Sequence, residues 1–288
     1  MARVLFLTQL LPYPLVSGAK IRAYYVLRHL AARHAVTLVS FVRGDDHPQY
    51  VEHLSGFLDE VHSVPMKRSS FRNARALLVS AITVRPAIIA REELGSMRRA
   101  VQDLLSAAPF DLVHADQLPM AQYGLLGQTA HVRCLLDQHN ATFQIIERMA
   151  RQERNPWLRL FMAREARAFA RYEVDVCQKF DHVTFVTEQD RQSLVTLSGE
   201  NLGPAGRRAL EQRSSVIPIC VDTDSAHLVP PVSSPFRVTH IGTMFWPPNI
   251  EGVLWFYRQV WPRIKALRPE ARLTLIGKNP PEAVRALD

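Results

Sequence analysis

Short apolar runs alternate with stretches of helical spacing along most of the chain. The runs have the length of strands and are rich in Val, Leu, Ile and Phe, which is typical of strands buried on both faces of a parallel sheet. Strands are expected at residues 3–8, 36–42, 60–66, 111–115, 133–137, 182–187, 215–219, 237–241 and 272–276. Helices are expected at 19–33, 71–82, 92–107, 156–180 (one long or two short) and 249–267. The alternation predicts an α/β fold with helices on both faces of a parallel sheet.

A proline-rich segment divides the chain into two parts of unequal size. Residues 222–235 include the sequence Val-Pro-Pro-Val-Ser-Ser-Pro, which has no helical period and predicts a stiff linker. The linker separates a domain of residues 1–221 from residues 236–288, whose pattern is that of two strands around one helix. About 50 residues cannot cover both faces of a sheet. We expect residues 236–288 to be an incomplete second domain or an appendage docked on the first.

The composition is that of a soluble globular protein, because 47% of the residues are apolar and 22% are charged. The three cysteines, Cys134, Cys177 and Cys220, are far apart, which argues against a disulfide scaffold or a zinc ribbon and favours a reducing compartment. No apolar run reaches the roughly 20 residues that span a bilayer, and the stretch after Met1 is shorter than a signal peptide requires. We therefore expect a cytoplasmic protein.

The net charge is +8, and only five of the 35 basic residues are lysine. Excess arginine is typical of sites for phosphate groups or anionic lipid heads, although a coding preference for arginine would also explain it. No helix-turn-helix, RNA-binding aromatic or zinc-finger pattern accompanies the charge, so nucleic acid is not an expected partner. Residues 66–79 are basic and then apolar. They predict either a helix that rests on an anionic membrane surface or an ordinary amphipathic surface helix.

The first candidate site follows the first expected strand. Gly18 opens a helix after a proline-rich loop and permits close approach to backbone N–H groups, which attract anions at a helix N-terminus. Lys20 and Arg22 add cationic donors. The loop predicts either a phosphate or acceptor site, or a glycine that serves turn geometry alone with both cations in solvent.

Two further strand ends carry titratable groups. His114 and Asp116 suit a general base or a ligand for a sugar hydroxyl, or else a histidine bonded to backbone and an aspartate that caps the next helix. Asp137, His139 and Asn140 follow the next strand, and a helix cap would explain only Asn140. Because ligands of parallel sheets bind outside the carboxyl ends of the strands, we expect these two ends and that of the first strand to matter most.

Several segments, taken in order, resemble glycosyltransferase family 4. The matching pieces are residues 4–30, 36–39, 110–114, 137–140, 183–188, 216–222, 241–249 and 275–277. They span nearly the whole chain, and their combined order is more specific than any one of them. The resemblance implies the GT-B fold. The N-terminal domain would then be a Rossmann-like parallel sheet, and residues 236–288 would begin a second Rossmann-like domain.

The resemblance also implies an activity, namely transfer of a sugar from a nucleotide-sugar donor to a glycan or lipid-linked acceptor. It implies no metal or other cofactor and a role in cell-surface polysaccharide synthesis. Separately from the resemblance, the basic residues of 66–79 and the net charge favour a place on the inner face of the cell membrane for this expected cytoplasmic protein. The implied catalytic residues are Asp116 and His139. The implied acceptor-binding residues are Gly18, Lys20, Arg22, His114, Asp137 and Asn140. The implied donor-binding residues are Gly242, Thr243 and Asn249.

Two departures from the family pattern bear on activity. The arginine and lysine that hold the donor diphosphate in the family are missing from residues 242–249, and the family's glutamate pair would fall beyond Asp288. We therefore expect a truncated chain with weak or no turnover. The alternatives are a non-enzymatic remnant that binds an acceptor, a lipid or a partner subunit, and a sugar-nucleotide epimerase of the same architecture.

Overall fold

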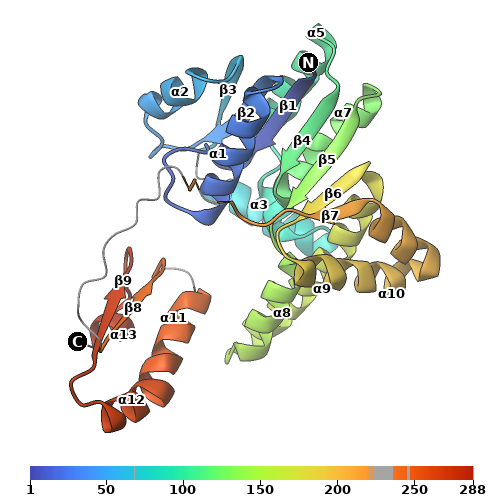
Figure 1. Ribbon diagram of the computed structural model, residues 1–288. Helices are drawn as coiled ribbons and strands as arrows, with labels where there is room; N and C mark the ends of the chain where they lie inside the picture. Colours follow the sequence, from blue (N-terminus) through green and yellow to red (C-terminus); the bar gives the residue numbers. More distant parts are fainter. Residues whose placement is uncertain (68, 221, 224–235, 245–246, 288) are drawn as a thin grey trace. The chain divides into compact units, whose positions relative to one another are not determined.

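The chain divides into two compact units, Met1–Thr223 and Asp224–Asp288. The computed structural model describes residues 1–67, 69–220, 222–223, 236–244 and 247–287, and Figure 1 labels the main elements of both units. Most of the expected linker, residues 224–235, lies outside the described residues.

The first unit is built on a seven-stranded parallel sheet with the strand order β3-β2-β1-β4-β5-β6-β7 (Figure 1). Its strands are β1 (Arg3–Thr8), β2 (Ala35–Val42), β3 (Glu60–Pro65), β4 (Leu112–Asp116), β5 (Arg133–Gln138), β6 (His182–Phe185) and β7 (Ser214–Val216). Each lies within two residues of its expected start, and the last is shorter than expected. The predicted fold class, an α/β fold with a Rossmann-like parallel sheet, is confirmed.

Helices connect the strands of this sheet. They are α1 (Gly18–Ala31), α2 (Pro48–Ser55), α3 (Ser70–Ile82), α4 (Ala87–Arg91), α5 (Gly95–Ala107), η1 (Leu118–Met120), α6 (Ala121–Gly124), α7 (Leu126–Thr129), α8 (Thr142–Gln152), α9 (Pro156–Lys179) and α10 (Glu188–Gln212). The segment expected as one long or two short helices is the single helix α9. Among the described helices, none combines the length and the hydropathy that crossing a bilayer requires.

The helix expected over 92–107 is confirmed as α5, but it begins three residues later than expected, at Gly95, after α4 has ended at Arg91. The reason is a side chain from elsewhere in the fold. The buried Tyr123 hydroxyl donates to the carbonyl of Glu92 (2.6 Å) and accepts from the N–H of Leu94 (2.7 Å). These backbone groups therefore bond to a tyrosine and are not available to a helix.

The two faces of the sheet carry separate apolar clusters. Val4 and Phe6 of β1 pack with Tyr24 and Leu27 of α1 and with residues of α2. The alternate positions of β1 pack on the other face, with residues of α5, α6, α7 and α9. Since side chains alternate along a strand, the last residue of β1 lies on the same face as Phe6, under α1. Polar groups at this level of the sheet are therefore shielded from solvent by α1.

The second unit contains a small parallel sheet of two strands, β8 (Arg237–Ile241) and β9 (Arg272–Ile276). Its helices are α11 (Pro247–Trp255), a π-helical segment (Phe256–Val260), α12 (Trp261–Leu267) and α13 (Glu282–Arg285). The strand-helix-strand order is as expected. A cluster of three buried apolar residues forms its core, and these are Met244, Val253 and Val284.

Candidate functional site

A row of polar side chains crosses the large sheet, one from each strand. The register pairs Thr8 of β1 with Asp116 of β4, and Asp116 with Asp137 of β5. From edge to edge the row consists of Ser63, Ser40, Thr8, Asp116, Asp137, Thr184 and Ser215. Residues in register on parallel strands point to the same face, so the row forms a polar strip on the face that α1 covers.

The centre of this row lies at the switch point of the sheet. The strand order runs outward from β1 to β3 in one direction and from β4 to β7 in the other, so β1 and β4 are where it reverses. Open α/β sheets bind their ligands outside the strand ends at such a point. Thr8 and Asp116, the last residues of β1 and β4, therefore mark the place where a ligand is expected.

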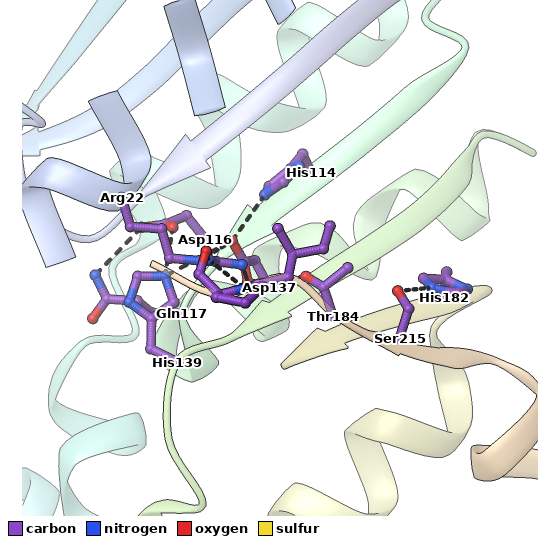
Figure 2. Close-up of polar contacts among 11 residues, drawn as sticks. Arg22, His114, Asp116, Gln117, Asp137, His139, His182, Thr184 and Ser215 are labelled. Atoms are coloured by element: carbon purple, nitrogen blue, oxygen red, sulfur yellow. Dashed lines mark hydrogen bonds and ion pairs between the residues drawn. The ribbon is translucent and has the colours of Figure 1, made fainter. Parts of the chain in front are cut away.

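Arg22 and Asp137 form a buried bidentate ion pair. Arg22 donates from Nε to Asp137 Oδ2 and from Nη2 to Oδ1, both at 2.8 Å, and each side chain is only 2% exposed. Thr184 Oγ1 donates to the same Oδ1 at 2.9 Å. Figure 2 shows the guanidinium directed at the carboxylate from α1. Two parallel charge-assisted hydrogen bonds fix both side chains in one orientation.

The remaining nitrogen of Arg22 holds the segment that follows β7. Nη1 donates to the carbonyl oxygens of Ile217 and Pro218, at 2.7 and 3.1 Å. Arg22 thus joins α1, the end of β5 and this segment. A direct contact of Arg22 or Asp137 with an acceptor would require the pair to open, and their assignment as acceptor-binding residues stays a prediction.

His139 and Asp116 form a hydrogen-bonded dyad beside this pair. His139 Nε2 lies 2.9 Å from Asp116 Oδ1 and 3.9 Å from Asp137 Oδ2. Gln117 Nε2 donates to the other oxygen of Asp116 at 3.3 Å (Figure 2). An ionised carboxylate only accepts hydrogen bonds, so Nε2 of His139 is the donor, and in the neutral ring Nδ1 is left as the acceptor.

His114 completes the cluster from inside the sheet. Its ring stacks on Phe6 with the centroids 4.1 Å apart, and its Nε2 lies 3.9 Å from Asp137 Oδ2. Within the described residues, this buried nitrogen has no hydrogen-bond partner. The alternative of a histidine satisfied by the backbone therefore does not describe this nitrogen.

The pKa values of the cluster diverge. Burial lowers the pKa of His114, although Asp137 and Asp116 act in the opposite sense. Burial alone would also lower the pKa of His139, but the charge of Asp116 and its hydrogen bond outweigh burial and raise it. Burial alone would raise the pKa of Asp137, and the hydrogen bonds from Arg22 with the nearby cationic groups reverse this and lower it. Neighbouring groups with pKa values moved apart are suited to proton transfer.

The other residues expected at the site, from the loop before α1 and the end of β5, are not part of the hydrogen-bonded cluster. Gly18 is exposed and is the first residue of α1, which Ser17 caps by accepting from the N–H of Lys20 at 3.5 Å. Lys20 Nζ donates to the carbonyl of Tyr13 and lies 3.6 Å from Asp46 Oδ1. Lys20 is thus paired, contrary to the alternative in which it is free in solvent. Asn140 is exposed just beyond β5.

The predicted donor-binding residues lie in the second unit. Asn249 Nδ2 donates to the carbonyl of Thr243 at 3.0 Å, and the N–H of Gly242 donates to the carbonyl of Ile276. A Cβ on Gly277 would lie 2.0 Å from Gly242 O, so only glycine fits there. The ends of β8 and β9 are therefore closely packed backbone, and their role in donor binding stays a prediction.

Three residues of the centre are also spaced as metal ligands would be. Asp116, Asp137 and His139 each place one ligand atom within 4.8 Å of the others. Both oxygens of Asp137 already accept from Arg22, and the guanidinium charge opposes a divalent cation at this place. The donor set fits a hydrogen-bonded network better than a metal, and the expectation of no metal stays a prediction.

Two residues of the centre are not among those expected from the sequence. Thr184 binds Asp137, and Gln117 binds Asp116 from a backbone with φ of 71°. Thr184 lies within an expected strand, one residue before the strand ends. That position is the sequence signal that marks it as a candidate for the site. The contact itself depends on β5 and β6 being neighbours, which the sequence does not state.

A family model described as "Glycosyl transferase 4-like domain" matches residues 17–210, which is more than half of the chain. The matched region includes Arg22, Asp116, Asp137 and His139. Among curated proteins, no relative matches this chain.

Solved structures share the fold at low sequence identity. Anabaena Alr3699/HepE in complex with UDP-glucose has a TM-score of 0.53 and 14% identity, covering 97% of this chain and 70% of that one. An E. coli structure described as trehalose-6-phosphate bound with UDP-2-fluoro glucose has a TM-score of 0.54 and 12% identity, covering 99% and 67%. Phytolacca americana UGT2, complexed with UDP-2-fluoro-glucose and pterostilbene, has a TM-score of 0.52 and 10% identity, covering 97% and 72%.

Proposed function

This chain belongs to the glycosyl transferase 4-like family, and from that premise we propose that it acts on a nucleotide-sugar donor and a sugar-accepting hydroxyl. The observation that carries the proposal is the His139–Asp116 dyad, which lies beside the Arg22–Asp137 pair at the switch point of the sheet. All four residues fall within the family match. The GT-B structures with similar folds contain UDP-glucose or UDP-2-fluoro glucose, which supports a nucleotide-sugar donor here.

The dyad would handle the acceptor hydroxyl. With Nε2 of His139 bonded to Asp116, the ring is oriented and Nδ1 is the nitrogen that can take a hydroxyl proton. The charge of Asp116 stabilises the imidazolium that results, in line with the raised pKa of His139. The negative charge of Asp116 would also favour an oxocarbenium-like centre on the transferred sugar. Asp137 is a positioning residue here, because Arg22 holds both of its oxygens.

The acceptor, the donor-binding residues and the turnover rate are each proposed on separate grounds. A glycan or lipid-linked acceptor and a role in cell-surface polysaccharide synthesis are proposed from the family resemblance. A location at the inner face of the membrane is proposed from the basic residues of 66–79 and the net charge. Gly242, Thr243 and Asn249 are proposed for the donor, with no metal. We also propose slow turnover, because no cationic side chain occurs among residues 242–249 to hold a diphosphate.

A non-enzymatic binding module is the second candidate. It is favoured by one observation, namely that the described part of the second unit has a two-stranded sheet and a core cluster of three buried residues. A core of this size contributes little stability, so it would not hold a donor pocket rigid enough for catalysis.

The experiment is a single-turnover assay with the 288-residue chain in excess over labelled UDP-sugars and a lipid extract as acceptor, combined with calorimetry of donor binding. His139→Gln and Asp116→Asn are expected to slow transfer by about 10²–10⁴-fold while donor affinity is kept. His29→Gln, at an exposed position near the end of α1, is the control and should transfer at the wild-type rate.

Three results distinguish the candidates. Transfer that depends on His139 supports the enzyme. Donor or acceptor binding without transfer supports the binding module. If no nucleotide sugar binds and none is consumed, the proposed function is wrong.

A further inference from the structure

Helix α3 is packed the opposite way from an ordinary surface helix. Its buried residues are the small Ala76 and Ser80, whereas Phe71, Leu78 and Ile82 are exposed, Phe71 to 80%. A surface helix normally turns its large apolar side chains to the core and its polar ones to water. The arrangement leaves a row of large apolar side chains without cover along one face of α3, at positions separated by seven and four residues.

The start of α9 extends this face. Trp157 is 80% exposed, and Phe161 follows one turn later on the same side of the helix. One further turn on, Arg164 donates to Ser80 Oγ (2.7 Å) and to the carbonyl of Thr83 (2.7 Å), so this side of α9 faces the end of α3. We refer to the combined set as the apolar surface. It consists of Phe71, Leu78, Ile82, Val84, Trp157 and Phe161.

Buried polar contacts hold the apolar surface in shape. Glu165 of α9 accepts from Ser80 of α3 (2.5 Å) and from the N–H of Ala87 at the start of α4 (2.7 Å), and it is paired with Arg164. A groove of about 290 Å³ lies above this junction, between Leu77, Ile88 and Phe161. Its lining is mostly apolar. The exposure of the apolar surface therefore belongs to a built arrangement of three helices.

The charges around the apolar surface are of one sign along α3. No acidic residue occurs in the sequence between Glu60 and Glu92, a stretch with six basic residues. Lys67 and Arg75 of this stretch are exposed, and Arg75 lies between Phe71 and Leu78 on the outward face. Cations beside exposed large apolar side chains fit an anionic lipid surface, which takes the apolar groups among its acyl chains and the cations at its head groups.

We infer that the apolar surface docks the first unit onto an anionic phospholipid bilayer. Phe71, Leu78 and Trp157 enter the boundary between head groups and acyl chains, and Lys67 and Arg75 contact lipid phosphates. Helix α4, which lies next to α3, ends close to the switch point, because Gln9, directly after β1, donates to Glu92, directly after α4, at 2.6 Å. The inference goes beyond the proposed transfer reaction and needs neither donor nor acceptor.

The test is co-sedimentation of the 288-residue chain with vesicles, without any nucleotide sugar. One set of vesicles is phosphatidylcholine with about 30% phosphatidylglycerol, and the other is phosphatidylcholine alone. Binding is expected to the anionic vesicles and to weaken at least severalfold as salt is raised to about 1 M. The triple variant Phe71→Ser, Leu78→Ser, Trp157→Ser should lose at least about tenfold in vesicle affinity, and Lys67→Glu with Arg75→Glu a similar amount.

Matched controls change the same residue types elsewhere. Leu202→Ser with Trp255→Ser removes exposed apolar side chains of α10 and α11, and Arg99→Glu with Arg133→Glu reverses two exposed arginines. These variants should bind vesicles like the wild type. Circular dichroism and thermal unfolding confirm that every variant is folded.

Other outcomes overturn the inference. Failure of the wild type to bind anionic vesicles, equal binding to neutral vesicles, or equal loss in the controls would each do so. Concentration-dependent dimerisation that the triple variant abolishes, with no vesicle binding, would show that a second copy of the chain covers the surface instead. Since no sugar transfer is measured, failure of the proposed function would leave these results unchanged.

Discussion

Arg22 and Asp137 are 115 positions apart in the sequence, yet Arg22 Nε and Nη2 each lie 2.8 Å from an oxygen of Asp137 in the interior of the first unit. Burying two charges is costly, and the cost is offset here by bidentate geometry and by further partners. Thr184 adds a donor to Asp137, and two backbone carbonyls accept from Arg22. The pair therefore links α1, β5 and the segment after β7, next to the proposed catalytic dyad.

Removing the arginine should destabilise the fold. Arg22→Met leaves Asp137 buried without its main partner, and we expect a loss of about 3–5 kcal/mol in the free energy of unfolding. Urea denaturation at neutral pH measures it. Arg99→Met, on the exposed face of α5, is the control and should change the stability by less than about 0.5 kcal/mol. A loss of unfolding free energy from Arg22→Met no larger than the control's would contradict a structural role for the ion pair.

The two histidines of the cluster should titrate on opposite sides of the ordinary pKa of 6.5. Imidazole nitrogen NMR of the wild type, assigned with His114→Gln and His139→Gln, should show His139 protonated at a pH where His114 is already neutral. In Asp116→Asn the pKa of His139 should fall, since its main source of stabilising charge is removed. Titration of both rings together near 6.5 would argue against the arrangement.

The free energy of unfolding should depend on pH in the way that the raised pKa of His139 dictates. A group with a folded-state pKa above its unfolded value contributes stability that is complete below the unfolded pKa and is lost as the pH rises through the folded pKa. The advantage of the wild type over His139→Gln in free energy of unfolding should therefore shrink over the pH range that lies above the ordinary histidine pKa of 6.5. A constant difference across that window would show that the imidazolium is not stabilised by Asp116.

Glu173, on α9, should make the protein less stable as the pH rises. Burial raises its pKa from 4.5 to about 8, with hydrogen bonds from Phe143 and Thr142 acting in the opposite sense. The unfolded chain ionises first, so the wild type should lose about 1.4 kcal/mol per pH unit relative to Glu173→Gln across that interval. Urea denaturation at several pH values measures this. Glu147→Gln, an exposed control on α8, should run parallel to the wild type.

Gly127 should not tolerate a side chain. A Cβ there would lie 2.7 Å from Val113 Cγ2 and 2.8 Å from Cys134 Sγ, so Gly127→Ala should cost about 1–3 kcal/mol. Gly95→Ala is the matched control, since a Cβ there meets nothing within 4 Å at the start of α5. It should be neutral or stabilising by up to about 1 kcal/mol, because it restricts the unfolded chain. Thermal unfolding of both variants separates packing from backbone effects.

Much of the fold could be predicted from local pattern. Strands such as β1 and β8 match their expected bounds because buried strands are continuous apolar runs between turn residues. The helices expected from the sequence differ from the observed ones where a distant side chain bonds to the backbone, or where glycine and proline interrupt the helical spacing. Tyr123 separates α4 from α5, and α10 was not expected because Gly203, with φ of 73°, and Pro204 interrupt it.

The strands, the order of the elements and the polar groups that follow particular strands could all be predicted from local sequence, because each depends on neighbouring residues. Which of those groups meet depends on how the strands are arranged in the folded sheet. His139 reaches Asp116, while Arg22 is drawn inward onto Asp137, because strand order and register set cross-strand distances. The exposed face of α3 was decided in the same way. A helix with both small and large apolar residues can bury either set, and the close approach of α9 through Glu165 and Ser80 selects the small ones.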